Sequence, residues 1–147
     1  DSLDSWTNFV GDEYKAFSGT AVYTTTINKV PVADVIKLDL GSVAENASVY
    51  LNGDYIGTVI DSPYQLYIPA EKFKGQDELV VRVANSMANR IAYMDKKEVD
   101  WKIFYNVNMS ARKKENVKNG IFDASDWEPK SSGLLGPVTL TPAMVKQ

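Results

Sequence analysis

Apolar side chains recur at every second position through most of this sequence, and no other feature constrains the fold as strongly. A period of two is the spacing of a β-strand with one buried face, because successive side chains point to opposite sides of a sheet. In residues 35–40, for example, Ile36, Leu38 and Leu40 alternate with Lys37 and Asp39. The same pattern predicts strands over residues 19–27, 47–51, 55–60, 64–68, 79–83, 99–109 and 138–140. Seven or eight short strands without a sustained helical period predict an all-β fold, a β-sandwich of the jelly-roll kind.

One turn is specified with particular clarity. Asn52 and Gly53 stand between two of the expected strands. A two-residue hairpin loop of type I′ needs positive φ at both central residues, which Asn and Gly adopt most readily. We therefore expect a β-hairpin that turns at Asn52-Gly53. The alternation also selects an expected core, which consists of Ile36, Leu38, Leu40, Val49, Leu51, Leu66, Ile68, Leu79, Val81, Val83, Val138 and Leu140.

Two stretches do not follow the strand pattern. Residues 85–97 form either a loop or a short helical turn, since Ala88, Ile91 and Ala92 have helical spacing. Residues 110–132 are rich in Lys, Asn and Asp and are expected to be irregular. Because 147 residues is a common size for one domain, we expect residues 1–147 to form a single β-sandwich domain.

The sequence contains no histidine and no cysteine. Without cysteine, disulfides and zinc–thiolate sites are excluded. Without histidine, the commonest general base, the Ser–His and Cys–His pairs and the usual metal ligand are missing. Catalysis by two carboxyl groups, as in glycoside hydrolysis, needs a pair about 5–9.5 Å apart, and sequence spacing nominates no such pair among the 19 acidic residues. We therefore expect no catalytic residue and no enzyme activity from this chain alone.

Charge and hydropathy exclude further classes of partner. Sixteen basic and 19 acidic residues give a net charge of −3, whereas nucleic acids and anionic membranes require clustered Lys and Arg. No apolar stretch approaches the ~18 residues of a membrane helix, so no membrane insertion is expected. The chain opens at Asp1 without a signal peptide, and we expect an excised or processed domain.

The acidic segment from Asp123 to Asp126 has a faint likeness to a calcium loop but lacks the glycine and the distal glutamate of an EF-hand. No cofactor and no metal site is therefore expected, and a structural calcium ion is left open without support.

Aromatic and planar polar side chains gather in and after residues 85–97. Such side chains suit a carbohydrate, because sugar C–H faces stack on aromatic rings while amide, guanidinium and carboxyl groups bind hydroxyls. Sandwich loops also gather at the two ends of the fold, where a rigid scaffold holds them. Each residue has a structural alternative: a Trp in a sandwich is usually core, and an Arg or Asp near a loop is usually an internal tie. The candidate ligand-binding residues are Asn89, Arg90, Tyr93 and Asp95, with Trp101 or Trp127 as a stacking platform.

Four blocks of the sequence resemble known families. Residues 17–23, residues 38–43 running on to 49–57 with Asn52-Gly53, and residues 79–85 with Asn89-Arg90 resemble the galactose-binding-like jelly roll that serves as the sugar-binding domain of family 2 glycoside hydrolases. Residues 132–138, with Gly133, Gly136 and Pro137, together with Asn89-Arg90 resemble the carboxy-terminal β-sandwich of family 106 glycoside hydrolases, the α-L-rhamnosidases. The resemblance spans residues 18–141.

In those families the catalytic acids lie in a separate barrel domain. The resemblance therefore implies a non-catalytic, carbohydrate-associated accessory module of a bacterial glycoside hydrolase, with a rhamnosidase-like or family 2-like parent. The expected partners are a carbohydrate and the catalytic domain of the parent chain, and the expected location is periplasmic or extracellular. The alternative is a purely structural domain that supports the catalytic barrel and binds no sugar. Exposed rings at Tyr93, Trp101 and Trp127 would favour binding, and buried rings would favour support.

Overall fold

The computed structural model describes residues 2–103 and 113–143. The chain forms two compact units. The first, here called the sandwich unit, consists of Asp1–Trp6, Gly19–Asn85 and Ser131–Gln147, and the second, the helical unit, consists of Thr7–Ser18 and Ser86–Lys130. The expectation of one domain over residues 1–147 stays a prediction.

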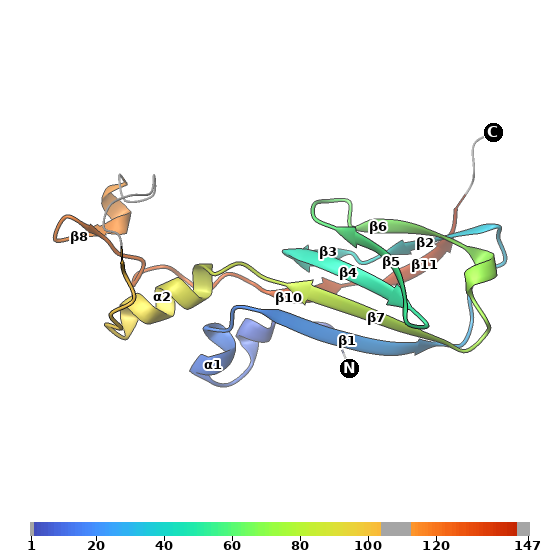
Figure 1. The fold of residues 1–147 in the computed structure, drawn as a ribbon, viewed down its shortest axis with the longest axis horizontal. Coiled ribbons are helices and arrows are strands. Elements are labelled where there is room, and N and C mark those ends of the chain that lie inside the picture. Colours follow the sequence, from blue (N-terminus) through green and yellow to red (C-terminus); the bar gives the residue numbers. More distant parts are fainter. Residues whose placement is uncertain (1, 104–112, 144–147) are drawn as a thin grey trace. The chain divides into compact units, whose positions relative to one another are not determined.

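The larger sheet of the sandwich unit has four antiparallel strands in the order β1-β7-β4-β5 (Figure 1). These strands are β1 (Thr20–Ile27), β7 (Asp77–Ala84), β4 (Asn46–Leu51) and β5 (Asp54–Val59). Buried residues alternate in β7 with exposed or half-buried ones, which gives the sheet one apolar face and one solvent face. The expected strands at 19–27, 47–51, 55–60 and 79–83 are thereby confirmed.

A three-stranded sheet in the order β11-β2-β6 lies against the apolar face, and a two-stranded sheet pairs β10 with β3. Their bounds are β2 (Val35–Asp39), β3 (Ser42–Ala44), β6 (Gln65–Pro69), β10 (Gly133–Gly136) and β11 (Thr139–Pro142), and a short 3₁₀ turn, η2 (Ala70–Lys72), follows β6. Side chains from both larger sheets share one hydrophobic core. The all-β sandwich fold is confirmed, and of the expected core only Leu66, Val138 and Leu140 are partly rather than fully buried.

The β4–β5 hairpin turns where the sequence places it. Asn52 has φ of 52° and Gly53 has φ of 85°, which are the two positive values that a type I′ turn requires. The turn is fastened to β7 through Asp77, which is buried at 1% exposure. Asp77 Oδ1 accepts hydrogen bonds from Asn52 Nδ2 (2.7 Å) and from the amide of Lys74 (2.8 Å), and its Oδ2 accepts one from the amide of Gly75 (3.0 Å). Asp77 therefore joins two turns that are far apart in sequence.

The glycines of the closing block let the backbone pass close to other parts of the sandwich unit. Gly133 has φ of +119°, and a Cβ atom there would lie 2.6 Å from the hydroxyl of Tyr23 and 3.0 Å from the ring of Trp6. That same Tyr23 hydroxyl accepts a hydrogen bond from the amide of Leu134 (3.2 Å). Gly133 therefore allows β10 to lie against Tyr23 and Trp6, a reason for this glycine that the sequence alone does not supply.

The helical unit has little regular structure. It contains α1 (Asp12–Lys15), α2 (Ala88–Lys96), the 3₁₀ turn η4 (Lys114–Asn116) and a hairpin of two-residue strands, β8 (Val117–Lys118) and β9 (Ile121–Phe122), while the 3₁₀ turn η1 (Trp6–Asn8) begins in the sandwich unit. The helical alternative for residues 85–97 is thus confirmed. The expected strand over 99–109 is wrong for residues 99–103, which form no strand, and its remainder lies outside the described residues. Local alternation misled there because Trp101 packs on a small core of its own.

Candidate functional site

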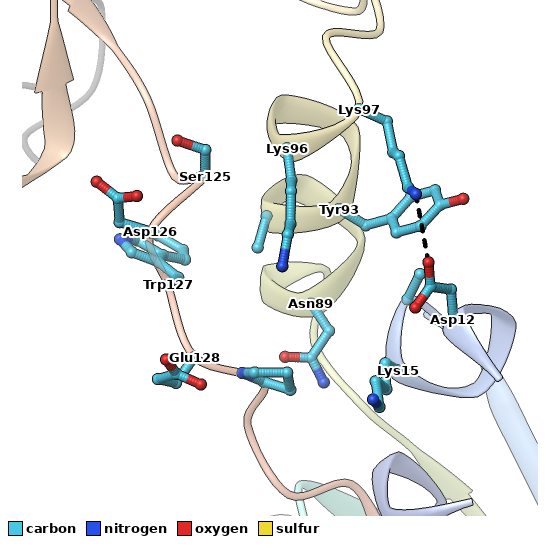
Figure 2. A pocket seen from close by; sticks show the side chains of 13 residues that line it. Asp12, Lys15, Asn89, Tyr93, Lys96, Lys97, Ser125, Asp126, Trp127 and Glu128 are labelled. Atoms are coloured by element: carbon cyan, nitrogen blue, oxygen red, sulfur yellow. Dashed lines mark ion pairs between the residues drawn. The ribbon is translucent and has the colours of Figure 1, made fainter. Parts of the chain in front are cut away.

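A cavity of about 340 Å³ in the helical unit gathers three of the expected site residues (Figure 2). Asn89 and Tyr93 reach it from successive turns of α2, because residues four apart share one helix face. Trp127 reaches it from the segment 125–129 on the opposite wall. The remaining lining side chains come from α1, from α2, from the residue that follows each of these helices and from the same segment: Asp12, Lys15, Ala16, Ala92, Lys96, Lys97, Ser125, Asp126, Glu128 and Pro129.

Asn89 holds the cavity wall together. Its Nδ2 donates to the carbonyl of Lys130 (2.8 Å), and its Oδ1 accepts from the amide of Lys130 (2.8 Å). The Asn89 side chain is buried, and its amide group pairs with the Lys130 backbone in the same donor-and-acceptor manner as a neighbouring strand. Asn89 therefore acts as an internal tie between α2 and the segment that carries Trp127.

Asp95 is the second internal tie and does not line this cavity. Its Oδ1 accepts a hydrogen bond from Trp101 Nε1 (2.7 Å) and lies 2.8 Å from Lys102 Nζ, and its Oδ2 accepts one from the amide of Ala124 (2.8 Å). Asp95 and Trp101 line a separate hollow of about 360 Å³. The structure thus separates the expected site residues into two groups rather than one cluster.

The two rings at the cavity differ in how firmly they are held. Trp127 packs edge-on against Phe122, with centroids 5.8 Å apart, and its Nε1 donates to Asn116 Oδ1 (2.9 Å). Tyr93 is half-buried and lies between two cations, with Arg90 5.8 Å and Lys97 5.6 Å from its ring centroid. Arg90 itself is exposed on α2. Both rings are half-buried where they line the cavity, so each is intermediate between a core residue and a surface residue.

The cavity is also lined by charged side chains that the sequence did not identify as candidates. Lys97 forms an exposed ion pair with Asp12 of α1 at 3.3 Å. Lys96 extends its ammonium group toward the Asn89 end of the cavity, and Asp126 stands beside Trp127 (Figure 2). Helical spacing from Tyr93 could have suggested Lys96 and Lys97, whereas nothing in the sequence indicates that Lys15 or Glu128 comes near α2.

The acidic segment from Asp123 forms a turn. The carboxylate of Asp123 accepts hydrogen bonds from the hydroxyl and from the amide of Ser125. The bond from the Ser125 hydroxyl is the main reason that the pKa of Asp123 lies below its usual value. Among residues 2–103 and 113–143, no three Asp or Glu side chains come together as a metal ion would require, and no helix has the length and apolarity to cross a membrane.

No family model matches this chain. The chain is 34% identical over 155 residues to the "Putative beta-glucuronidase" of Formosa agariphila, and this match covers 95% of the chain and 13% of that protein. The structure of a rhamnosidase from Novosphingobium sp. PP1Y superposes on 94% of the chain and 12% of its own length, with a TM-score of 0.73 and 28% identity. Ruminococcus gnavus beta-glucuronidase has a shorter likeness over 56% of the chain, with a TM-score of 0.47 and 22% identity.

The Formosa agariphila protein and the Novosphingobium rhamnosidase confirm the resemblance to large glycoside hydrolases, and the rhamnosidase structure confirms the sandwich fold. These two matches cover 95% and 94% of the chain, yet the chain spans only 13% of the Formosa agariphila protein and 12% of the Novosphingobium rhamnosidase. The chain therefore corresponds to a small part of such a hydrolase and not to a whole one.

Proposed function

We propose that this chain is a non-catalytic accessory domain of a bacterial glycoside hydrolase and that it contacts carbohydrate through the cavity of the helical unit. The match of 95% of the chain to 13% of a much longer relative supports the accessory role most directly. The partner of this domain is the catalytic domain of the parent chain. A parent enzyme that hydrolyses glycans outside the cell would place the domain in the periplasm or outside the cell. The names of the relatives suggest rhamnosides and glucuronides as the sugars to test.

The chemistry of the cavity supports sugar contact. A cavity of about 340 Å³ falls within the ~300–1,000 Å³ of small-molecule sites. Tyr93 and Trp127 offer ring faces for sugar C–H groups, and the lysine and carboxylate side chains of the lining offer donors and acceptors for hydroxyls. Asn89 and Asp95 serve this site as scaffold, since their polar atoms are occupied by internal bonds.

The structural alternative has its own supporting observation. Asn89, Asp95, Trp101 and Trp127 each make hydrogen bonds within the helical unit, as they would if this unit served only to pack against another domain. In that case the cavity would be filled by a side chain of the parent protein instead of a sugar. The two functions differ in whether the isolated chain binds a free saccharide.

Binding to the isolated 147-residue chain separates the two functions. Methyl α-L-rhamnoside and methyl β-D-glucuronide are titrated into the ¹⁵N-labelled chain, and a single-site Kd in the millimolar to micromolar range is expected, about −4 to −8 kcal/mol. Chemical-shift changes should centre on α2 and residues 125–129. Tyr93→Ala and Lys96→Ala should weaken binding, while Lys114→Ala, an exposed lysine of the same unit outside the cavity lining, should not.

Two results would refute the proposal. The first is that neither glycoside changes the chemical shifts of residues in this cavity at 10 mM, roughly the weak limit of a millimolar site. The structural alternative would then be the one that remains. Turnover of aryl rhamnosides or aryl glucuronides by the isolated chain, abolished by Asp126→Asn, would contradict the accessory role.

A further inference from the structure

The solvent face of the four-stranded sheet carries an ordered group of rings, hydroxyls and one cation, all within the sandwich unit. Cross-strand partners share a face, and the register gives two adjacent rows across the strands β1, β7, β4 and β5. One row is Val22, Arg82, Ser48 and Thr58, and the other is Thr24, Val80, Tyr50 and Tyr55. We call these eight residues the tyrosine face.

Five of the eight side chains of the tyrosine face contact one another. The guanidinium of Arg82 lies over the Tyr50 ring, 4.8 Å from its centroid. The rings of Tyr50 and Tyr55 meet edge-to-face at 5.5 Å. The Thr58 hydroxyl is hydrogen-bonded both to Ser48 (2.7 Å) and to the Tyr55 hydroxyl (2.9 Å). Side chains that are already ordered lose little entropy when a ligand binds.

Arg82 gives the tyrosine face its sign of charge. It is the one charged residue among the eight positions and forms no ion pair with any described residue. Glu78 points to the same side of β7 four residues away, roughly 13 Å along the backbone, and no ion pair joins it to Arg82 within the described residues. A guanidinium stacked on a ring keeps its N–H edge free, and that edge matches a carboxylate in a bidentate geometry.

From these observations we propose that the tyrosine face binds an acidic saccharide, a short oligosaccharide that carries a uronate carboxylate. The carboxylate pairs with Arg82, a sugar ring stacks on Tyr55, whose side chain is 59% exposed, and sugar hydroxyls exchange hydrogen bonds with the hydroxyls of Ser48 and Thr58. This site is distinct from the cavity of the helical unit and does not depend on sugar binding there.

The dimensions favour a saccharide over a protein. Four strands at about 4.8 Å spacing and two rows of side chains give a patch of about 14 by 7 Å between Cα positions, which is the length of a few linked sugar rings. A stable protein interface takes about 20–30 residues on each partner, whereas the tyrosine face has eight residues.

The test uses a charge-matched pair of ligands on the isolated chain. A trimer of galacturonic acid and its methyl ester, which differ in charge and little else in shape, are titrated into the ¹⁵N-labelled protein. The acid should perturb residues of β1, β4, β5 and β7 and bind at least fivefold more tightly than the ester, with an affinity that falls as salt rises. Arg82→Gln should weaken binding of the acid about tenfold, which corresponds to about 1.4 kcal/mol, and Arg82→Lys should weaken it less.

Matched controls separate this site from others. Tyr55→Ala should weaken binding, whereas Tyr67→Ala, an equally exposed tyrosine (61%) on β6 of the other sheet, should not. Lys114→Gln, at an exposed lysine of the helical unit outside the cavity lining, should also leave affinity for the acid unchanged.

Several results would overturn the proposal. These are equal affinity for acid and ester, shifts confined to the helical unit, and no binding at 10 mM trimer. Self-association of the chain that depends on Tyr55 would reassign the tyrosine face to a second copy. Slowed amide exchange on this face only in the longer parent protein would reassign it to another domain.

Discussion

Replacing Asp77 by asparagine tests how much one buried carboxylate contributes to the sandwich. In the native protein the two carboxylate oxygens accept hydrogen bonds from Asn52, Lys74 and Gly75. An asparagine has one oxygen, which can keep the bonds from Asn52 and Lys74, while its NH₂ group then faces the amide of Gly75. A buried donor without an acceptor costs about 1–3 kcal/mol, and the lost charge weakens the bonds that remain. We expect Asp77→Asn to lower the free energy of unfolding by about 2–3 kcal/mol, a large share of the ~5–15 kcal/mol of an ordinary domain.

The same variant should show a characteristic pH dependence. Burial acts to raise the pKa of Asp77, but the bonds from Asn52, Lys74 and Gly75 outweigh it and hold the pKa below the ordinary value of 3.8. A lowered folded-state pKa means that the stabilisation is fully present above pH 3.8 and is lost as pH falls through the folded value. The difference in stability between wild type and Asp77→Asn should therefore be constant near neutral pH and shrink below pH 3.8.

Urea unfolding followed by circular dichroism at several pH values measures this difference. Asp61→Asn, at an exposed loop aspartate, is the control and should change stability by less than about 0.5 kcal/mol. A destabilisation by Asp77→Asn that stays constant down to pH 2.5, or one no larger than that of Asp61→Asn, would refute the argument that the charged form of Asp77 holds the two turns together.

Three further substitutions address the backbone and the core, each measured by the same unfolding assay. Gly53→Val should cost about 1–2 kcal/mol, because the site has positive φ but open space around a Cβ, and an equal cost for Gly53→Asn would contradict this reason. Gly133→Ala should cost about 1–3 kcal/mol more than Gly75→Ala, since both glycines have positive φ but only Gly133 would place a Cβ against Tyr23 and Trp6. Leu38→Ala, at a side chain with 0% exposure, should cost about 2–5 kcal/mol, and a change below 1 kcal/mol would show that the core collapses into the space.

Sequence alone predicts the sandwich because its signals are local. The alternation around Leu38 or Val81 depends on burial of one strand face, and Asn52-Gly53 depends on backbone geometry within two residues. The candidate site was harder, since its members act over long separations. Asn89 bonds to Lys130 and Asp95 to Ala124, and no local pattern distinguishes such ties from ligand-binding groups. Trp101 misled for the same reason: its alternation resembles a strand, although a contact with Asp95 decides its position.

The sequence did not predict the tyrosine face, for a related reason. Tyr50 and Tyr55 flank the expected hairpin turn, but Arg82 comes from β7, and only the register between β4 and β7 brings it beside them. A search along the chain favours residues that are near one another in sequence, such as Asn89 to Asp95. Cross-strand neighbours are visible only once the pairing of strands is known.

The hydrogen bond between the side chains of Asn85 and Ser132 has a consequence for how such domains diversify. Asn85 ends the path out of β7, and its Nδ2 donates to the hydroxyl of Ser132 (3.1 Å), where the chain returns to enter β10. The two ends of the long excursion over residues 86–130 are thus fastened to each other within the sandwich unit. Replacing roughly 45 residues by a linker of about five would lower the cost of closing this connection by only about 2 kcal/mol, since that cost grows with the logarithm of length. Asn85 and Ser132 therefore form a natural graft point, where inserts of very different size and chemistry can be exchanged while the sandwich keeps its fold.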